Sequence, residues 1–472
     1  MKKIKVFLFL ILFLGLLFYS PHISAQGKIK RSHVIELDRI LSRFNNQTPG
    51  VAVAVDSGGE IIYKRGFGMS NLELNVPIQT DSVFHIASIS KQFAAMSVVL
   101  LEQQGKLSID DDIRKYIEEV PDFGETITIR HLANHTSGLR DQWELLGLAG
   151  WRQEDLKTNE DVLDLVSRQK ALNFKPGEEY LYCNTGYTLL AILVGRVSGK
   201  SLREFADENI FKPLGMNHTH FHNDMSEIVI GRTQAYIPGR RGSYRISIPN
   251  FNTYGATSLF TTVEDLTLWS RNFFHKKIGG EEGIRRLLTK GLLNNGEKIN
   301  YALGVSHGEH RGLKTIGHGG ADAGYRSNLV IYPTQDLSIV VFANVSNGNP
   351  GGLSREVAEV LLAGEFKEER PKPAAQKRPP QPKRPTLSDQ QLAEYVGDFY
   401  SAELDIVYTI YKKDGSLYLN RRKFPANKLF VRAGDTLIWA GRELAFQRDG
   451  NKKITGFLLT RGRVRNLKFV KK

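Results

Sequence analysis

A serine and a lysine stand three residues apart at the start of a long apolar segment. Residues 84–93 read FHIASISKQF, and the apolar segment that they open runs to Leu101 and ends at Gly105. The length of this run and the glycine that ends it predict a buried helix. Ser88 and Lys91 would then lie one turn apart on the same face, about 5–6 Å from each other. Burial lowers the pKa of a lysine, so its neutral amine could accept the serine proton.

Two further motifs carry groups that suit the same chemistry. A Ser-x-x-Lys pair alone also fits a polar first turn with an exposed lysine. However, residues 182–184 read YCN after a Lys-Pro-Gly turn, and residues 318–320 read HGG just before a predicted hairpin.

Taken together, the three motifs resemble the serine β-lactamase and penicillin-binding protein family, in its class C-like, D-aminopeptidase and esterase branch. The likeness extends over most of 33–365 and includes the segments 105–111, 129–139 and 213–216. The resemblance implies an α+β fold of the DD-peptidase/β-lactamase type, in which helices flank an antiparallel sheet beside a helical subdomain. It implies neither a cofactor nor a metal.

The resemblance also assigns roles to individual residues. Those implied for catalysis are Ser88, Lys91 and Tyr182, and those implied for substrate binding are Asn184, His318, Gly320 and Ala321. Ser88 would form the acyl-enzyme and Lys91 would hold its proton network. The phenol of Tyr182 would be the second half of the base, with its pKa lowered by the neighbouring ammonium. Backbone N–H groups of Ser88 and Ala321 would form the oxyanion hole.

One departure from the family pattern bears on the substrate. His318 stands where β-lactamases usually carry lysine, as in peptidase and esterase members. This predicts that β-lactam hydrolysis is not the main task, and that a His318 imidazolium could hold a substrate carboxylate.

The function predicted from these residues is a serine hydrolase that cleaves amide or ester bonds, with D-amino-acid peptides of cell-wall type as favoured substrates. The partner is a small peptide, ester or β-lactam-like molecule, and peptidoglycan is a further candidate. Two alternatives stay open: a non-catalytic penicillin or peptidoglycan sensor that stays acylated, and an envelope-binding module with vestigial catalysis. The oligomeric state is left undetermined.

Several other residues suggest chemistry that the sequence does not require. His218, His220 and His222 alternate as on one strand face, which a metal would favour, but the resemblance implies a metal-free protein and no metal is predicted. We expect His131 and His135 to satisfy backbone groups around the turn 136–138. Cys183, the single cysteine, excludes an intramolecular disulfide and is expected to be a small buried residue.

The elements that position these motifs mix strands and helices. The segments 51–55 and 60–64 predict one hairpin, and 328–332 with 337–342 predict another. Helical segments lie between them, for example one whose start has capping-box spacing between Thr261 and Glu264. This arrangement predicts one sheet that is closed by distant parts of the chain.

Composition divides the chain into four parts. We expect a signal peptide at 1–25, a hydrolase domain at 26–365, a linker at 366–386 with six prolines within fifteen residues, and a small antiparallel β-barrel at 387–472. The barrel resembles the lipocalin-like domain of some D-aminopeptidase relatives. A loop such as 421–423 would approach the active site, or the barrel would serve stability or surface binding. The hydrolase domain is expected to fold without it.

Charge and the first residues bear on location. Lys2, Lys3 and Lys5 precede an apolar run that is shorter than a membrane span, and cleavage after Ala25 would release a periplasmic or secreted protein. An uncleaved chain would be tethered to the inner membrane. The net charge of +14 resides largely in the C-terminal part, because 387–472 carries 17 basic and 9 acidic residues. Because the excess positive charge lies outside the hydrolase domain, that domain is not predicted to bind nucleic acid. The basic C-terminal part would either bind an anionic envelope surface or simply be a solvated exterior.

Overall fold

The computed structural model describes residues 29–250, 252–369, 385 and 387–472. The predicted signal peptide lies outside these residues, as do linker positions 370–384 and 386. Among the described residues, no helix is both long and apolar enough to cross a membrane.

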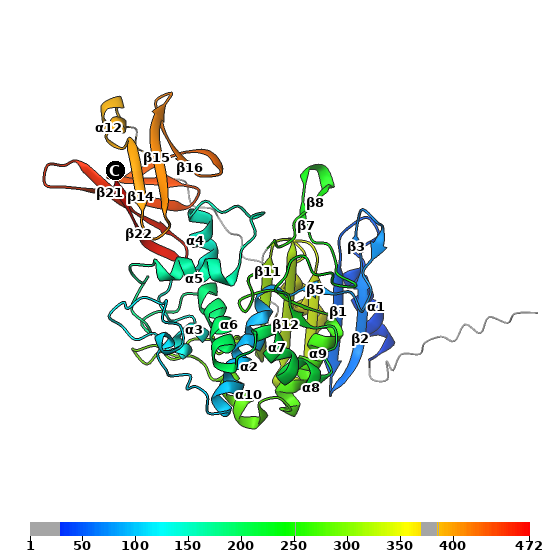
Figure 1. Cartoon of the computed structure of the whole chain (residues 1–472). Coiled ribbons are helices and arrows are strands. Elements are labelled where there is room, and N and C mark those ends of the chain that lie inside the picture. The colour runs from blue at the N-terminus through cyan, green and yellow to red at the C-terminus, as the bar shows by residue number, and fades with distance from the viewer. Residues whose placement is uncertain (1–28, 251, 370–384, 386) are drawn as a thin grey trace, which may run out of the picture.

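A six-stranded antiparallel sheet forms the centre of the predicted hydrolase domain (Figure 1), in the order β10-β11-β12-β13-β1-β2. The strands are β1 (Val51–Ser57), β2 (Glu60–Phe67), β10 (Ser306–His310), β11 (Leu313–Asp322), β12 (Tyr325–Tyr332) and β13 (Leu337–Ala343). Both predicted hairpins are present, as β1–β2 and β12–β13. The sheet is closed by distant segments, as predicted, because Val51 pairs with Ala343.

Helices cover both faces of this sheet. Alternate side chains of β1 point to opposite faces, so Val53 packs with α1 (Arg31–Leu41) and α11 (Pro350–Leu361), whereas Ala54 belongs to the larger core on the other face. That larger core contains α2 (Ser90–Gln103) and α9 (Val263–His275).

The start of α9 differs by one residue from the predicted capping box. Thr262, not Thr261, is the N-cap, and its side chain accepts a hydrogen bond from the Asp265 backbone N–H. Thr261 instead ends a strand, because its backbone pairs with Phe84. Strand pairing therefore outweighs the local capping signal.

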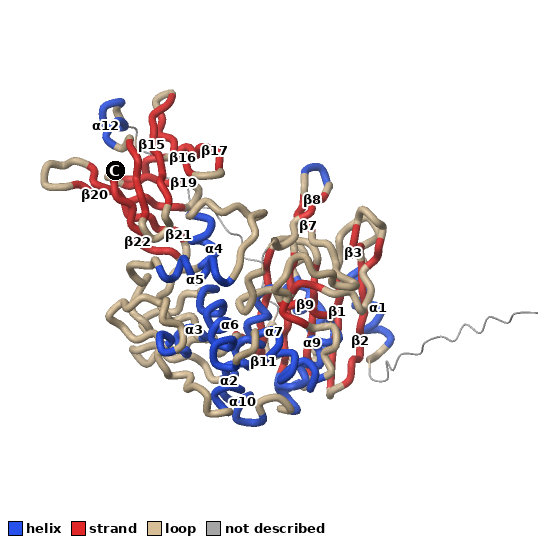
Figure 2. The backbone as a smooth tube through the Cα atoms, in the orientation of Figure 1, coloured by secondary structure: helices blue, strands red, loops and turns tan. Residues whose placement is uncertain are grey.

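A helical subdomain packs beside the sheet around α2 and α6 (Figure 2). Its helices are α3 (Ile129–Ala133), α4 (Gln142–Leu148), α5 (Asn159–Ser167), α6 (Asn184–Ser198), α7 (Leu202–Ala206), α8 (Lys212–Leu214) and α10 (Gly280–Leu288).

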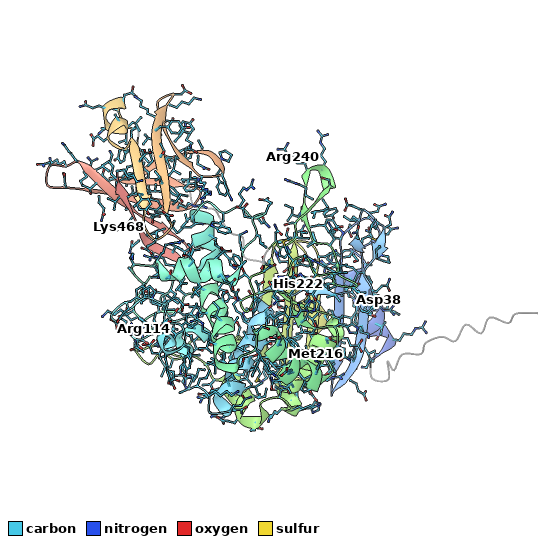
Figure 3. All side chains as sticks on the ribbon, viewed as in Figure 1. Asp38, Arg114, Met216, His222, Arg240 and Lys468 are labelled. Atoms are coloured by element: carbon cyan, nitrogen blue, oxygen red, sulfur yellow. The ribbon has the colours of Figure 1, made fainter. Side chains whose placement is uncertain are left out.

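Smaller sheets complete the hydrolase domain. A three-stranded sheet in the order β5-β9-β6 lies next to the start of α2, and two hairpins, β3–β4 and β7–β8, extend at the surface. Their bounds are β3 (Met69–Asn71), β4 (Val76–Pro77), β5 (Phe84–His85), β6 (His220–Phe221), β7 (Tyr236–Pro238), β8 (Tyr244–Ile246) and β9 (Leu259–Thr261). Figure 3 shows Arg240 at the tip of the β7–β8 hairpin.

The C-terminal region is a nine-stranded antiparallel sheet that curls into a nearly closed barrel, preceded by α12 (Asp389–Glu394). Its order is β17-β16-β15-β14-β22-β21-β20-β19-β18. The strands are β14 (Gly397–Ser401), β15 (Ile406–Lys413), β16 (Ser416–Arg421), β17 (Phe424–Lys428), β18 (Phe430–Ala433), β19 (Thr436–Trp439), β20 (Arg442–Arg448), β21 (Ile454–Arg461) and β22 (Val464–Lys471).

The barrel and the hydrolase domain share a hydrophobic core. Helix α4 lies against the barrel (Figures 1 and 2), and its buried Leu145, Leu146 and Leu148 join the same cluster as the barrel interior. At this junction Tyr408 donates a hydrogen bond of 2.7 Å to the carbonyl of Leu148. Arg140, which is also buried, forms a 2.6 Å ion pair with Glu403. The shared apolar cluster, this hydrogen bond and this ion pair therefore hold the two regions together.

Candidate active site

The predicted nucleophile occupies a tight turn. Ser88 lies in a 3₁₀ turn, Ala87–Ile89, immediately before α2, and it is partly exposed between buried neighbours. Ala87 has a φ of 49°, a left-handed conformation that is costly for a residue with a side chain. The hydroxyl of Ser90 donates to the Ala87 carbonyl at 2.5 Å and accepts from the Leu259 N–H at 3.0 Å. The Ser90 hydroxyl thus fixes the turn that presents Ser88.

Lys91 is fully buried one turn beyond Ser88, as the spacing predicted. Its Nζ donates to Asn184 Oδ1 at 2.9 Å and to the carbonyl of Ala256 at 2.6 Å, and lies 3.1 Å from Ser88 Oγ. Burial lowers the pKa of Lys91 to about 7, partly offset by the charge of Asp141. A neutral amine has two N–H groups, which the two oxygen acceptors use, so its lone pair is left facing Ser88 Oγ.

Asn184 is the first residue of α6, and a buried carboxylate fixes its orientation. Asp141 Oδ2 accepts hydrogen bonds of 2.8 Å from both the backbone N–H and the side-chain Nδ2 of Asn184. The amide oxygen is therefore the atom that faces Lys91. The sequence reasoning placed Asn184 at the site but missed Asp141, although this residue lies only two positions beyond the segment 129–139 that carried part of the resemblance.

Tyr182 lies at the site, but its pKa moves opposite to the expected direction. Its ring centroid is 4.9 Å from Lys91 Nζ, and its hydroxyl makes no hydrogen bond among the described residues. Burial raises the pKa of Tyr182 well above its ordinary value, even though the nearby Ser88 hydroxyl acts to lower it. The expectation of a phenolate lowered by the ammonium is therefore wrong for the free protein, because burial dominates and Lys91 itself loses its charge near neutral pH.

The strand β11 brings the third motif against the nucleophile turn. A Cβ on Gly320 would lie 2.3 Å from the Ile86 carbonyl and 2.1 Å from Ser327 Oγ, so only glycine allows this approach. Ser327 on β12 donates to the same Ile86 carbonyl at 2.7 Å. Ser88 and Ala321 consequently line the same cleft, where both backbone amides are needed for the predicted oxyanion hole.

His318 lies on β11 as a buried neutral imidazole. The carbonyl of Gly319, 2.6 Å from Nδ1, can only accept, so Nδ1 carries the proton and Nε2 accepts from the Tyr301 hydroxyl at 3.0 Å. Burial, together with the charge of Lys91, lowers the pKa of His318 to about 4. The expected imidazolium that binds a carboxylate near neutral pH therefore does not form.

All seven predicted site residues line or adjoin one cleft, with a volume of about 800 Å³. Ser88, Tyr182, Asn184, His318, Gly320 and Ala321 line it directly, and Lys91 lies beneath Ser88. Two of its lining residues, Asp322 and Thr257, were not predicted and are joined by a 2.7 Å hydrogen bond. Burial raises the pKa of Asp322.

The barrel contributes Arg463 to this cleft, which sequence reasoning did not foresee. Arg463 lies in the turn between β21 and β22, and its guanidinium is 3.1 Å from Asp141 Oδ2 and 5.8 Å from the Tyr182 ring centroid. The loop 421–423, which was expected to approach the site, instead contacts the Gly147 carbonyl through Arg421 and Asp155 through Lys423. No local sequence signal marks Arg463, because its role depends on how the barrel docks.

Predictions about three other residues hold fully or in part. His131 Nδ1 accepts from the Thr128 N–H at the start of α3, and His135 Nδ1 accepts from the Cys183 N–H at 3.1 Å. Both histidines satisfy backbone groups, as expected, but these groups lie outside the turn 136–138. Cys183 is buried with its thiol 3.4 Å from the Leu139 carbonyl, and burial raises the pKa of that thiol to about 12. Cys183 is therefore not a second nucleophile.

Sequence comparison relates the chain to known proteins. The Beta-lactamase family profile matches residues 37–364. Penicillin-binding protein 4* of Bacillus subtilis is 29% identical over 332 residues, which cover 67% of this chain and 72% of that protein. A D-aminopeptidase of Gluconobacter oxydans is 28% identical over 297 residues, which cover 63% of this chain and 56% of the relative, so the match spans little more than half of that protein.

Solved structures confirm the predicted fold class. The octameric penicillin-binding protein homologue of Pyrococcus abyssi aligns with a TM-score of 0.61 and 23% identity over 93% of this chain and 98% of that one. The D-amino acid amidase of Ochrobactrum anthropi aligns with a TM-score of 0.58 and 21% identity over 71% of this chain and 99% of that one. The chain therefore belongs to the beta-lactamase family and is a serine hydrolase of the beta-lactamase-related type.

Proposed function

We propose that this protein hydrolyses amide bonds of small D-amino-acid peptides or amides through an acyl-enzyme on Ser88. The observation that carries the proposal is the geometry of Lys91, whose two N–H groups are taken by fixed acceptors while its lone pair faces Ser88 Oγ. The names of the relatives, D-aminopeptidase and D-amino acid amidase, support amides of D-amino acids as the substrate class.

The proposed acylation begins with proton transfer from Ser88 to neutral Lys91 while Ser88 Oγ bonds to the substrate carbonyl carbon. The oxygen of the tetrahedral intermediate takes the negative charge and accepts from the backbone N–H groups of Ser88 and Ala321. The neutral phenol of Tyr182 donates its proton to the leaving amine and regains one from Lys91. The C–N bond breaks and leaves an ester on Ser88 with Lys91 neutral again.

In deacylation a water molecule replaces the amine. The Lys91–Tyr182 pair takes a proton from this water as its oxygen attacks the ester carbonyl, and the proton then returns to Ser88 Oγ as the ester bond breaks. The same groups therefore serve both halves of the reaction. A short ester would react by the same route, because only the leaving group differs.

The decisive experiment is intact-mass spectrometry combined with a substrate screen. D-aminoacyl and L-aminoacyl anilides, a D-Ala-D-Ala peptide, a short ester and a cephalosporin would be tested with the wild-type protein and Ser88→Ala. We expect turnover of D-aminoacyl substrates and a covalent adduct, both lost in Ser88→Ala. Adduct formation that persists in Ser88→Ala would refute the nucleophile, and preference for L-aminoacyl substrates would refute the substrate class.

The second candidate is a penicillin or peptidoglycan sensor, favoured by the match to penicillin-binding proteins. A sensor would give a stoichiometric burst of product without further turnover, because its acyl-enzyme would not hydrolyse. The same screen therefore separates it from the hydrolase.

We also propose that the chain is exported, with cleavage after Ala25, on the basis of the basic start and short apolar run of the sequence. In this location cell-wall peptides would be within reach of the cleft. Mass spectrometry of the protein from a fractionated host would find a chain that begins at Gln26. A full-length chain in the membrane fraction would instead show the tethered form.

A further inference from the structure

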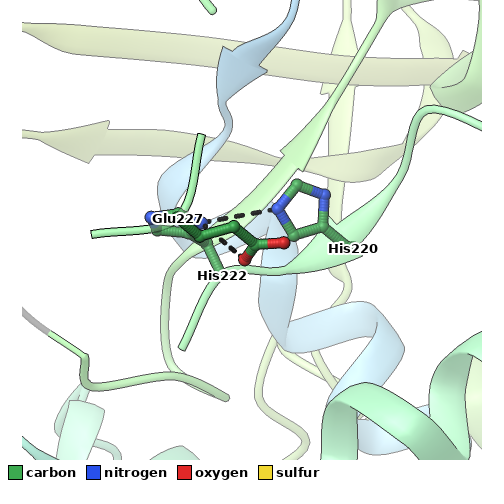
Figure 4. Close-up of side chains that lie close together, drawn as sticks. All are labelled: His220, His222 and Glu227. Atoms are coloured by element: carbon green, nitrogen blue, oxygen red, sulfur yellow. Dashed lines mark hydrogen bonds and ion pairs between the residues drawn. The ribbon is translucent and has the colours of Figure 1, made fainter. Parts of the chain in front are cut away.

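Two histidines and a glutamate converge at the edge of the sheet β5-β9-β6, outside the cleft that contains Ser88. Strand β6 consists of His220 and Phe221, and the His222 N–H continues the pairing with a 2.8 Å hydrogen bond to the Ser258 carbonyl. Alternate residues of a strand face the same side, so His220 and His222 lie together while Phe221 is buried in the core. Glu227 reaches them from the loop that follows (Figure 4).

The distances between their potential ligand atoms suit a metal ion. His220 Nε2 lies 3.4 Å from His222 Nδ1, and His222 Nδ1 lies 3.5 Å from Glu227 Oε2. One ligand atom from each residue lies within 4.8 Å of the others. In a tetrahedral zinc site with bonds of about 2.0–2.1 Å, neighbouring ligand atoms are roughly 3.3–3.4 Å apart. Two of the three separations therefore already match, and only the His220–Glu227 separation has to close.

The burial of His222 also calls for a partner on its Nδ1 side. The residue is 4% exposed, and its Nε2 has no hydrogen-bond partner among the described residues. Only Nδ1 can therefore form the interaction that offsets the cost of burying the imidazole. It faces two other electron-pair donors, His220 Nε2 and Glu227 Oε2. A single proton can join only two of these three groups, whereas one cation can accept a lone pair from each.

Arg203 on α7 holds the carboxylate and also limits the affinity for a cation. Its two terminal nitrogens lie 2.6 and 2.7 Å from Glu227 Oε2 and Oε1, and one of them lies 3.0 Å from Asn223 Oδ1. Arg232 stacks on the Phe260 ring, 5.0 Å from its centroid, and that ring also packs against His222. The positive charges of these two guanidinium groups weaken the binding of a cation at this site. The paired hydrogen bonds from Arg203 nevertheless fix the orientation of the Glu227 carboxylate, as residues that hydrogen-bond to metal ligands do.

We propose that His220, His222 and Glu227 bind one divalent transition-metal ion, with zinc favoured by the two nitrogen donors and one carboxylate and with water as the fourth ligand. The metal would join the loop around Glu227 to the sheet that supports the Ser88 turn, and its role is to stabilise this region. Figure 3 shows His222 within the hydrolase domain, apart from the barrel. The proposal departs from the sequence analysis, which considered His218, His220 and His222 together and predicted no metal. Exposed His218 is not part of the site, because it faces Asp265, at 3.8 Å, instead of this cluster.

The test uses the full chain, stripped of metal with a chelator and titrated with Co²⁺ alone, whose visible absorption reports tetrahedral nitrogen and oxygen ligation. We expect one Co²⁺ per chain, displacement of the absorption by Zn²⁺, and a rise in melting temperature with Zn²⁺. His222→Ala and His220→Ala should lose the absorption and the rise. His218→Ala is the matched control, since the exposed histidine two residues away should be dispensable.

A second variant distinguishes a metal site from a cluster that is held together only by ion pairs and hydrogen bonds among its own residues. Arg203→Gln removes the main partner of Glu227 but none of the proposed ligands, so it should keep the Co²⁺ absorption and bind Co²⁺ at least as tightly as the wild type. Absence of Co²⁺ absorption in the wild-type chain, or absorption that survives in His222→Ala, would overturn the proposal. Loss of binding in Arg203→Gln with retention in His220→Ala would equally contradict it.

Discussion

Lys91 can act as a base only when its amine is neutral, and this requirement gives the reaction a pH dependence. Because burial lowers its pKa to about 7, the neutral fraction increases as pH rises through that value. We predict that kcat/KM on an uncharged substrate rises with pH and levels off above about 7. A profile that is flat across this range, or that falls as pH rises, would contradict the assignment of the base.

The protonation of His318 can be compared with that of Lys91. With its pKa lowered to about 4, this imidazole is neutral throughout the range in which Lys91 titrates. Substrates with and without a carboxylate should therefore show the same limb near pH 7. The sequence could identify both residues by type and spacing, but it could not give their charge states, which depend on burial and on partners such as Tyr301 and Asn184.

At the scale of elements, the approach of β11 to the Ser88 turn depends on one missing side chain. A Cβ on Gly320 would lie within 2.3 Å of both Ser327 Oγ and the Ile86 carbonyl, whereas a Cβ on Gly319 would lie 3.8 Å from its nearest neighbour. We predict that Gly320→Ala displaces β11 and lowers kcat by roughly 10²-fold or more, the usual cost of an oxyanion donor. Gly319→Ala, the matched control, should remain close to wild type.

The measurement is kcat for both variants together with their melting temperatures. If Gly319→Ala and Gly320→Ala lose activity equally, or if Gly320→Ala is fully active, close packing of β11 on the turn is not what the reaction needs. The melting temperatures show whether either variant is simply unfolded.

Many of the secondary-structure elements could be predicted from the sequence. Short apolar runs in 51–55 and 337–342 identified the strands, and the Ser-x-x-Lys spacing identified the start of α2, because both signals are local. The boundary at Thr261 was missed by one residue, since a strand partner competes with the cap. Asp141 was missed because its role arises only when the start of α4 meets the start of α6.

At the scale of the whole molecule, Arg463 links the barrel to the proton network. It pairs with Asp141, and its positive charge helps to lower the pKa of Lys91. We predict that Arg463→Met shifts the acid limb of kcat/KM to higher pH, because loss of a nearby cation favours the protonated amine. Arg465→Met is the control. Arg465 belongs to the same β21–β22 hairpin but pairs with Glu179, so its replacement should leave the acid limb unchanged. Equal profiles for wild type and Arg463→Met would contradict the link.

The barrel also covers apolar surface, which bears on the expected independence of the hydrolase domain. A fragment that ends near Lys367 keeps Ser88, Lys91 and Asn184 but exposes Leu145, Leu146 and Leu148 on α4. We predict that this fragment still forms the Ser88 adduct, with a lower melting temperature and a tendency to associate. Calorimetry and light scattering would measure both. A fragment as stable and monomeric as the full chain would show that the shared core contributes nothing.

The pairing of β1 with β13 has a consequence for the order in which the protein acquires activity. A chain grows from its N-terminus, and Ser88, Lys91 and Tyr182 are all made before β10 begins at Ser306. The central sheet has to wait for residue 343, the partner of Val51, and pairing across so long a separation makes folding slow. A nascent chain therefore carries its reactive serine and lysine without the strand that completes the cleft, and it gains hydrolytic power only after residue 343 has been made.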